Sequence, residues 1–217
     1  DQDTSVFGVK DAYLNSDADF HTTVSKMADI PRDQAKTINL GLFYGMGKAK
    51  LQAELGVSKE KAEELFAQYH AKVPFVKQLM KSVSNRAQQR GQIRTLLGRL
   101  CRFHLWEPNR FGINKALPFE QAVQEHGQGN IRRAYTYKAL NKLIQGSAAD
   151  MTKKSMLDLY KEGIIAHIQI HDELDLSVES PEQAKKVVEI MENAVKLDVP
   201  NKVDYESGKN WGDIYDK

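Results

Sequence analysis

The spacing of apolar residues predicts helices over most of the first ninety residues. Apolar positions recur every three or four residues within four successive segments, 32–46, 48–55, 58–73 and 74–90. Ser58 suits an N-cap, Pro74 suits a first helical turn, and Gly91 suits a helix end. We therefore expect a helical first part of the chain.

The pattern changes twice in the second part. Residues 92–130 carry short apolar runs between Gly, Pro and Asn, which predicts a strand pair and loops. A long helix is predicted over 131–161, ending at Gly163. Alternating apolar runs at 164–170 and 174–178 predict two strands, followed by an amphipathic helix that Ser180 caps and Pro181 opens. The predicted fold class is α+β.

Composition sets the broad class of protein. The chain has 217 residues, of which 41% are hydrophobic and 28% are charged, enough for a sizeable core. No run of about 18 apolar residues exists, so we expect no membrane span. Cys101 is the only cysteine, which excludes an internal disulfide and fits a reducing cytosol. Residues 1–11 lack the basic start and apolar middle of a secretory signal.

Charge is unevenly distributed although the net charge is only +2. Between Lys72 and Lys115 there are ten Lys or Arg residues and one acid, Glu107. The last forty residues are rich in acids. Such segregation is typical of proteins that meet a polyanion, although a solvated basic face without a partner is the alternative.

An unusual stripe runs along the segment RDQAKTINLGLFYGMG. Arg32, Lys36, Leu40 and Phe43 fall within about 80° of one another on a helix, and Tyr44 flanks them. Two cations at this spacing repel each other, which an anion such as a triphosphate would relieve. The alternative is a basic surface helix whose apolar residues pack below.

A polar triplet joins the two predicted strands. His171, Asp172 and Glu173 would form the turn, which would place Asp172 rigidly at its tip. Carboxylates in such positions serve as Mg²⁺ ligands, whereas the alternative is an ordinary polar turn. A metal hydrolase with a His-Asp pair would need further histidines at suitable spacing, and the other five histidines lack it.

Two amide side chains share one face of the predicted helix in NKLIQGSAAD. Asn141 and Gln145 are four residues apart, and residues 146–149 are small. Small residues allow another helix or a nucleic-acid strand to approach closely, and amides suit a minor groove. Core packing is the alternative.

Together these segments resemble the motifs of family A DNA polymerases, closest to phage-type members. In order and spacing, RDQAKTINLGLFYGMG resembles the family's fingers helix, NKLIQGSAAD its helix with Asn and Gln, and IQIHDELDLSV its palm motif. DADFH, TLLGR and NWGD also fit, so the resemblance extends from about residue 13 to 211. It implies a helical fingers subdomain at 1–129. It also implies the C-terminal part of a palm at 130–217, an antiparallel sheet with packed helices that is incomplete on this chain.

The resemblance implies contacts to an incoming dNTP. Arg32, Lys36 and His21 would bind its phosphates, and Lys36 would also protonate the departing pyrophosphate. Tyr44 would lie beside the nascent base pair. Leu40 occupies the position against the sugar, where cellular members have Phe and one phage group has Tyr. We therefore expect a change in sugar discrimination and incorporation rate.

The resemblance also implies contacts to metal and DNA. Asp172 would hold Mg²⁺ with Glu173 in support, and the complete site would contain two such ions. Primer-template DNA would meet His171 near the primer end, Asn141 and Gln145 along the minor groove, and Arg99 at a phosphate.

One expected feature of the family has no counterpart here. The other metal-binding aspartate belongs to an Asp-Tyr-Ser run ahead of the fingers, which DQDTSVFGVK lacks, and the thumb and exonuclease domain are missing too. We therefore expect DNA-directed DNA polymerase activity only when an upstream segment or a second polypeptide supplies that aspartate and the thumb, and an inactive isolated chain. The expected location is the cytoplasm, that of a bacterial host if the protein is phage-encoded. The alternative function is a non-catalytic nucleic-acid-binding module that retains the polymerase shape.

Overall fold

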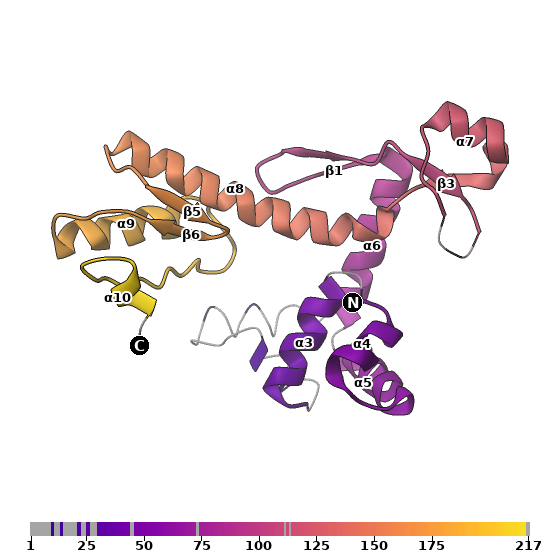
Figure 1. The fold of residues 1–217 in the computed structure, drawn as a ribbon, viewed down its shortest axis with the longest axis horizontal. Coiled ribbons are helices and arrows are strands. Elements are labelled where there is room, and N and C mark those ends of the chain that lie inside the picture. The colour runs from indigo at the N-terminus through magenta and orange to yellow at the C-terminus, as the bar shows by residue number, and fades with distance from the viewer. Residues whose placement is uncertain are drawn as a thin grey trace. The chain divides into compact units, whose positions relative to one another are not determined.

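A computed structural model describes residues 10, 14, 21–22, 25–26, 30–43, 46–72, 74–110, 112 and 114–215. It divides into two compact units, Asp1–Ser147 and Ala148–Lys217 (Figure 1). Helices predominate and the strands form short antiparallel pairs, so the predicted α+β class is confirmed. The predicted functional division between residues 129 and 130 stays a prediction.

The first unit begins with packed helices. They are α3 (Arg32–Phe43), α4 (Lys48–Leu55), α5 (Lys59–Lys72) and α6 (Pro74–Arg90). Ile38, Leu51, Tyr69 and Val76 contribute one buried side chain from each helix to a common core. This core fixes which face of each helix remains exposed.

The helix boundaries follow local sequence signals. The Lys61 backbone N–H donates to Ser58 Oγ at 3.2 Å, which confirms the predicted N-cap of α5. Gly91 has a φ of 68° directly after α6, a left-handed conformation that glycine adopts without strain. The predicted end of that helix is therefore confirmed.

A hairpin packs between α6 and the beginning of α8 (Ala139–Lys161). Strands β1 (Gln92–Arg94) and β2 (Leu100–Arg102) pair antiparallel, with Ile93 opposite Cys101. Ile93 and Phe103 share a second buried cluster with Ala87 of α6 and Leu140 of α8. The hairpin thereby places its turn, residues 95–99, beside α8.

The helix predicted to start at residue 131 is wrong in its first eight residues. Between β2 and α8 the chain forms β3 (Trp106–Pro108), α7 (Phe119–His126), the 3₁₀ helix η1 (Gln128–Asn130), β4 (Ile131–Arg133) and η2 (Thr136–Lys138).

The reason is a set of long-range contacts. Strand β4 pairs with β3, and the Arg133 guanidinium lies 4.5 Å from the centre of the Trp106 ring. Arg133 Nη1 also donates to the Phe103 carbonyl at 2.9 Å. These contacts join residues about 30 apart, so they override the local helical pattern.

The second unit contains the later turns of α8, a hairpin and α9 (Pro181–Asn193), with α10 (Gly212–Tyr215) near the end of the chain. The predicted hairpin is confirmed as β5 (Ile168–Ile170) and β6 (Glu173–Asp175). The backbone N–H of Gln183 donates to Ser180 Oγ at 3.2 Å, which confirms the predicted cap of α9.

The β5–β6 hairpin has one covered face. Leu174 and Leu176 pack against Leu159 of α8 and Val187 of α9. Ile168 and Ile170 of β5 are 43% and 36% exposed.

Among the described residues, no helix is both long and apolar enough to span a membrane.

Candidate functional site

Helix α3 presents the predicted cationic stripe on its exposed face. Arg32, Lys36 and Leu40 are all exposed, Leu40 by 41%, whereas Ala35 and Ile38 are completely buried. The two faces follow from the helical period, because positions 35 and 38 lie about one turn apart on the inward side. Leu40 is therefore no core residue. Tyr44 lies outside the described residues.

Residues 21 and 22 are held against α3. Arg32 Nε donates to Thr22 Oγ1 at 3.1 Å. One residue earlier, His21 Nδ1 lies 3.2 Å from Asn39 Nδ2. The structure therefore brings His21 and Arg32, two of the predicted phosphate ligands, to the same helix.

A buried hydrogen bond lies behind His21. Tyr69 of α5 donates its hydroxyl to Asn39 Oδ1 at 2.6 Å, and both residues have no exposed surface. Burial raises the pKa of the Tyr69 hydroxyl, so the group remains a protonated donor. Sequence reasoning missed Asn39 and Tyr69. The available signal was an amide between Ile38 and Leu40, where the cationic stripe borders the buried face of α3.

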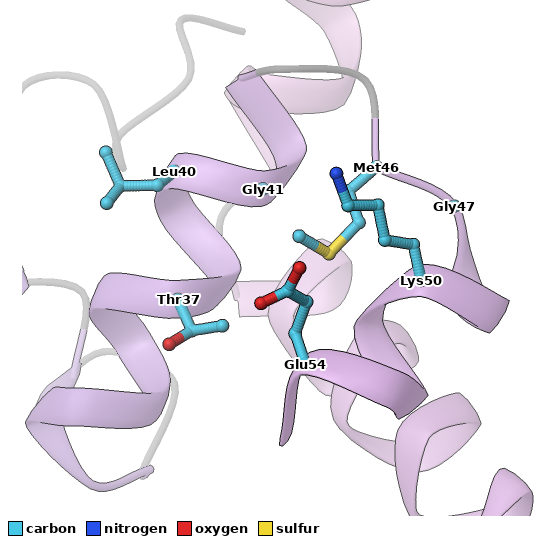
Figure 2. A pocket seen from close by; sticks show the side chains of 7 residues that line it. All are labelled: Thr37, Leu40, Gly41, Met46, Gly47, Lys50 and Glu54. Atoms are coloured by element: carbon cyan, nitrogen blue, oxygen red, sulfur yellow. The ribbon is translucent and has the colours of Figure 1, made fainter. Parts of the chain in front are cut away.

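A hollow of about 480 Å³ lies between α3 and α4 (Figure 2). Its lining combines apolar, small and charged residues: Thr37, Leu40, Gly41, Met46, Gly47, Lys50 and Glu54. Figure 2 shows the Met46 side chain beside those of Lys50 and Glu54, whereas Leu40 extends from the opposite side of α3. A Cβ at position 41 would lie 2.2 Å from Met46 Cε, so glycine leaves room for that side chain.

The β5–β6 turn displays its carboxylate openly. Ile170 pairs with Glu173, so His171 and Asp172 form a two-residue turn, and His171 has the positive φ of 52° that such turns require. Gln169 Nε2 donates to the His171 carbonyl at 2.6 Å and braces the turn. Asp172 is exposed, as the sequence predicted for the tip of the hairpin.

Asp172 fits one position of a magnesium site. The described part of the chain contains no group of three or more His, Cys, Asp or Glu side chains arranged to hold a metal ion. Mg²⁺ commonly takes one or two protein carboxylates and completes its shell with water and phosphate oxygens. The turn therefore offers one ligand of such a site. The same finding gives no support to a histidine-rich hydrolase centre.

Asn141 and Gln145 lie one turn apart on α8. Gln145 is exposed, and Asn141 Oδ1 is buried without a hydrogen-bond partner among the described residues. An amide oxygen left in this state is costly unless a ligand or water donates to it. This atom is therefore a candidate contact for an additional molecule.

The small residues after Gln145 receive the turn of the β1–β2 hairpin. The Leu96 backbone N–H donates to Ser147 Oγ at 3.0 Å, and Arg99 Nη2 donates to the Gly146 carbonyl at 2.8 Å. A Cβ at position 146 would lie 2.7 Å from Thr95 Cγ2. The sequence predicted the approach of a helix or a nucleic-acid strand, whereas at positions 146 and 147 a protein turn approaches.

The predicted metal and nucleotide residues belong to different units. Arg32, Lys36 and His21 lie in the first unit, whereas Asp172 and Glu173 lie in the second.

Comparison with known proteins shows the family. The model of DNA polymerase family A matches residues 10–213. A DNA-directed DNA polymerase of Pseudomonas phage M6 is 33% identical over 243 residues, covering 96% of this chain and 33% of that protein. DNA polymerase I of Geobacillus stearothermophilus is 36% identical over 205 residues, covering 89% of this chain and 21% of that protein.

A solved structure is similar as well. It is the POL domain of Pol1 from M. smegmatis in complex with DNA primer-template and dNTP, with a TM-score of 0.68 and 28% identity. The match covers 89% of this chain and 34% of that chain, so this chain spans about a third or less of these relatives. The family match over residues 10–213 shows that the chain belongs to DNA polymerase family A.

Proposed function

We propose that the chain supplies the fingers and the C-terminal palm portion of a DNA-directed DNA polymerase. The reaction is the template-directed transfer of a dNMP from a dNTP to a primer 3′-OH. The observation that carries the proposal is the exposed stripe of Arg32 and Lys36 on α3, with His21 held against the same helix. The family match over residues 10–213 supports the class of reaction.

Helix α3 would bind the triphosphate of the dNTP. Arg32 and Lys36 stand one turn apart and can both donate charge-assisted hydrogen bonds to phosphate oxygens, the strongest class of hydrogen bond available there. Lys36 can also give a proton to the departing pyrophosphate. Leu40, one turn further, would contact the sugar, and Tyr44 would lie beside the base pair.

Asp172 would hold Mg²⁺, and Glu173 would support it. The braced two-residue turn favours this role because a metal ligand on a rigid element keeps its position. When bound, the magnesium ions neutralise phosphate charge and make the primer hydroxyl more acidic. Two ions need a further carboxylate besides Asp172.

We further propose that an upstream segment or a second polypeptide contributes that carboxylate and the thumb. Within the described residues β5 pairs only with β6 and exposes Ile168 and Ile170. A strand whose second edge has no partner strand among the described residues, and whose apolar side chains are exposed, is a natural place for another strand to add. The chain by itself would then bind its ligands without completing the reaction.

Primer-template DNA would contact α8 and the β5–β6 turn. Asn141 Oδ1, which has no hydrogen-bond partner among the described residues, supports a minor-groove contact, in which Gln145 would join. His171 would lie near the primer end. Arg99 already donates to the Gly146 carbonyl, so it would contact a DNA phosphate with its remaining guanidinium hydrogens.

Primer extension by the chain, combined with the rest of the polymerase, tests the nucleotide role. We expect Arg32→Ala and Lys36→Ala each to lower kcat/KM for dNTP by about a hundredfold, as for removal of one preorganised charge-stabilising donor. Lys77→Ala, at an exposed position of α6, is the matched control. Salt-dependent DNA binding without any dNTP effect would favour the non-catalytic module instead.

A further inference from the structure

We propose that Asn39 and Tyr69 are positioning residues that hold His21 with its ring proton on Nε2, directed to a nucleotide phosphate. Likewise, Thr22 is a positioning residue that orients the Arg32 side chain through a hydrogen bond. The inference rests on the proposed function, because that function names the triphosphate as the ligand of His21 and Arg32. None of the three supporting side chains belongs to the predicted set of ligands.

The chain of hydrogen bonds starts in the core. Asn39 and Tyr69 have no exposed surface, so each polar group must find a partner inside the protein or lose stability. Tyr69 donates to Asn39 Oδ1 at 2.6 Å, and burial keeps the hydroxyl protonated by raising its pKa. The amide of Asn39 is thereby fixed with its oxygen towards α5.

That orientation determines the tautomer of His21. Because Oδ1 faces Tyr69, Asn39 presents its Nδ2–H group to His21 Nδ1 at 3.2 Å. Nδ1 must then accept, so the proton of a neutral imidazole resides on Nε2. An Nε2–H group is a donor, which is what a phosphate oxygen requires.

A second hydrogen bond holds Thr22, the residue after His21, against α3. Thr22 Oγ1 accepts from Arg32 Nε at 3.1 Å. Arg32 and Asn39 are seven residues apart, or about two helical turns, so they lie on nearly the same side of α3. Residues 21 and 22 are thus fastened to the helix at two points, and the fastening sets the direction of both predicted phosphate ligands.

Nitrogen-15 NMR of the full chain with labelled histidines tests the tautomer. His21 is identified as the resonance that His21→Gln removes. We expect the Nε2–H form in the native chain and a mixture of both tautomers in Tyr69→Phe, which keeps the ring but loses the hydroxyl. In Asn39→Asp the carboxylate can only accept, so we expect the Nδ1–H form. A native Nδ1–H form, or a tautomer unchanged in both variants, would overturn the proposal.

Affinity for dNTP with Mg²⁺, measured by calorimetry on the chain combined with the rest of the polymerase, tests the consequence. We expect Tyr69→Phe to weaken binding by about three- to tenfold, the effect of one hydrogen bond. Tyr160→Phe, at a position 67% exposed, should leave binding unchanged. Circular dichroism verifies that the variants fold.

Thr22→Val tests the positioning role independently if the core variant Tyr69→Phe does not fold. It removes the hydroxyl without changing the core, and we expect a loss of about threefold that Thr22→Ser restores. Loss of binding in His21→Gln with native affinity in both Tyr69→Phe and Thr22→Val would refute the positioning role while the proposed function stands. An absence of dNTP binding by the native protein would refute the proposed function, and with it the ligand named here.

Discussion

At the scale of single residues, Leu40 distinguishes this chain most clearly. It is exposed on the stripe that carries Arg32 and Lys36, and in the proposed function it would lie against the sugar of the dNTP. A leucine there offers a smaller, non-planar surface than the aromatic residue of cellular members. The side chain is no core residue, and we propose that it belongs to the ligand surface.

We expect Leu40→Phe to change kcat/KM for dNTP by about fivefold and to alter discrimination between deoxy and dideoxy sugars. The basis is the additional contact of an aromatic ring, worth about 1 kcal/mol. Steady-state incorporation assays on the combined polymerase measure both effects. Leu79→Phe, at an α6 position that is also 41% exposed, is the matched control. Equal kinetics for the two variants would contradict the role of Leu40.

His70 gives the first unit a predictable response to acid. Burial, reinforced by the charge of Lys77, lowers the pKa of His70 below its ordinary value. The unfolded chain therefore binds more protons than the folded chain below about pH 6.5, so the free energy of unfolding falls as pH falls.

We expect His70→Phe to reduce this loss of stability between pH 7 and pH 5. The Phe66 ring already lies 4.4 Å from the His70 ring and can pack against phenylalanine. Urea unfolding at several pH values measures the slope, with His104→Phe at an exposed position as control. An unchanged slope in His70→Phe would show that other groups cause the acid response.

At the scale of elements, a substitution at the contact between α8 and the β1–β2 turn would change the free energy of unfolding through two opposing effects. Gly146→Ala gains about 1 kcal/mol of helix propensity. The new Cβ would lie 2.7 Å from Thr95 Cγ2, and such overpacking costs about 1–3 kcal/mol. We therefore expect a net destabilisation of about 1 kcal/mol in urea unfolding.

Thr95→Ser removes the opposing methyl group but keeps the hydroxyl that accepts from the Arg99 backbone N–H. In that background we expect Gly146→Ala to become stabilising by about 1 kcal/mol. The same sign of effect in both backgrounds would mean that the methyl contact does not explain glycine at position 146.

The elements that sequence reasoning predicted correctly are those with local causes. The Ser58 and Ser180 caps and the glycine after α6 depend on neighbours within four residues. The predicted turn of His171, Asp172 and Glu173 is correct in its place but one residue too long, because Glu173 pairs with Ile170. Strand β4 could not be predicted from such local signals, because it forms by pairing with the strand that contains Trp106, far away in the sequence.

The features of the candidate site also differ in whether their causes are local or distant in the sequence. The alignment of Arg32, Lys36 and Leu40 follows from the helical period alone, so the sequence was sufficient to predict that they share a face. Whether Leu40 packs into the core was left open by the sequence, and the structure shows it exposed. The link from Tyr69 through Asn39 to His21 joins residues 18 and 30 positions apart, so only the folded chain displays it. In a sequence, such a hydrogen-bonded link is indicated only by a polar residue at a helix position that becomes buried.

At the scale of the whole molecule, the proposed nucleotide residues and the proposed metal residues lie in separate compact units. Its length is about a third of that of the phage relative and a fifth of that of the bacterial one. Within the described residues, the exposed β5 strand and the absence of a carboxylate cluster around Asp172 both support our proposal that other residues complete the site. We therefore expect activity to depend on what the chain is combined with.

The most direct test of this account is single-nucleotide extension of a labelled primer-template by the chain combined with the rest of the polymerase. With saturating Mg²⁺ and dNTP, we predict extension by the native assembly and a loss of at least about a thousandfold in Asp172→Asn, or roughly 4 kcal/mol of transition-state stabilisation. Affinity for the primer-template should change less than about threefold, a difference below 1 kcal/mol. Extension by Asp172→Asn at the native rate would contradict the account.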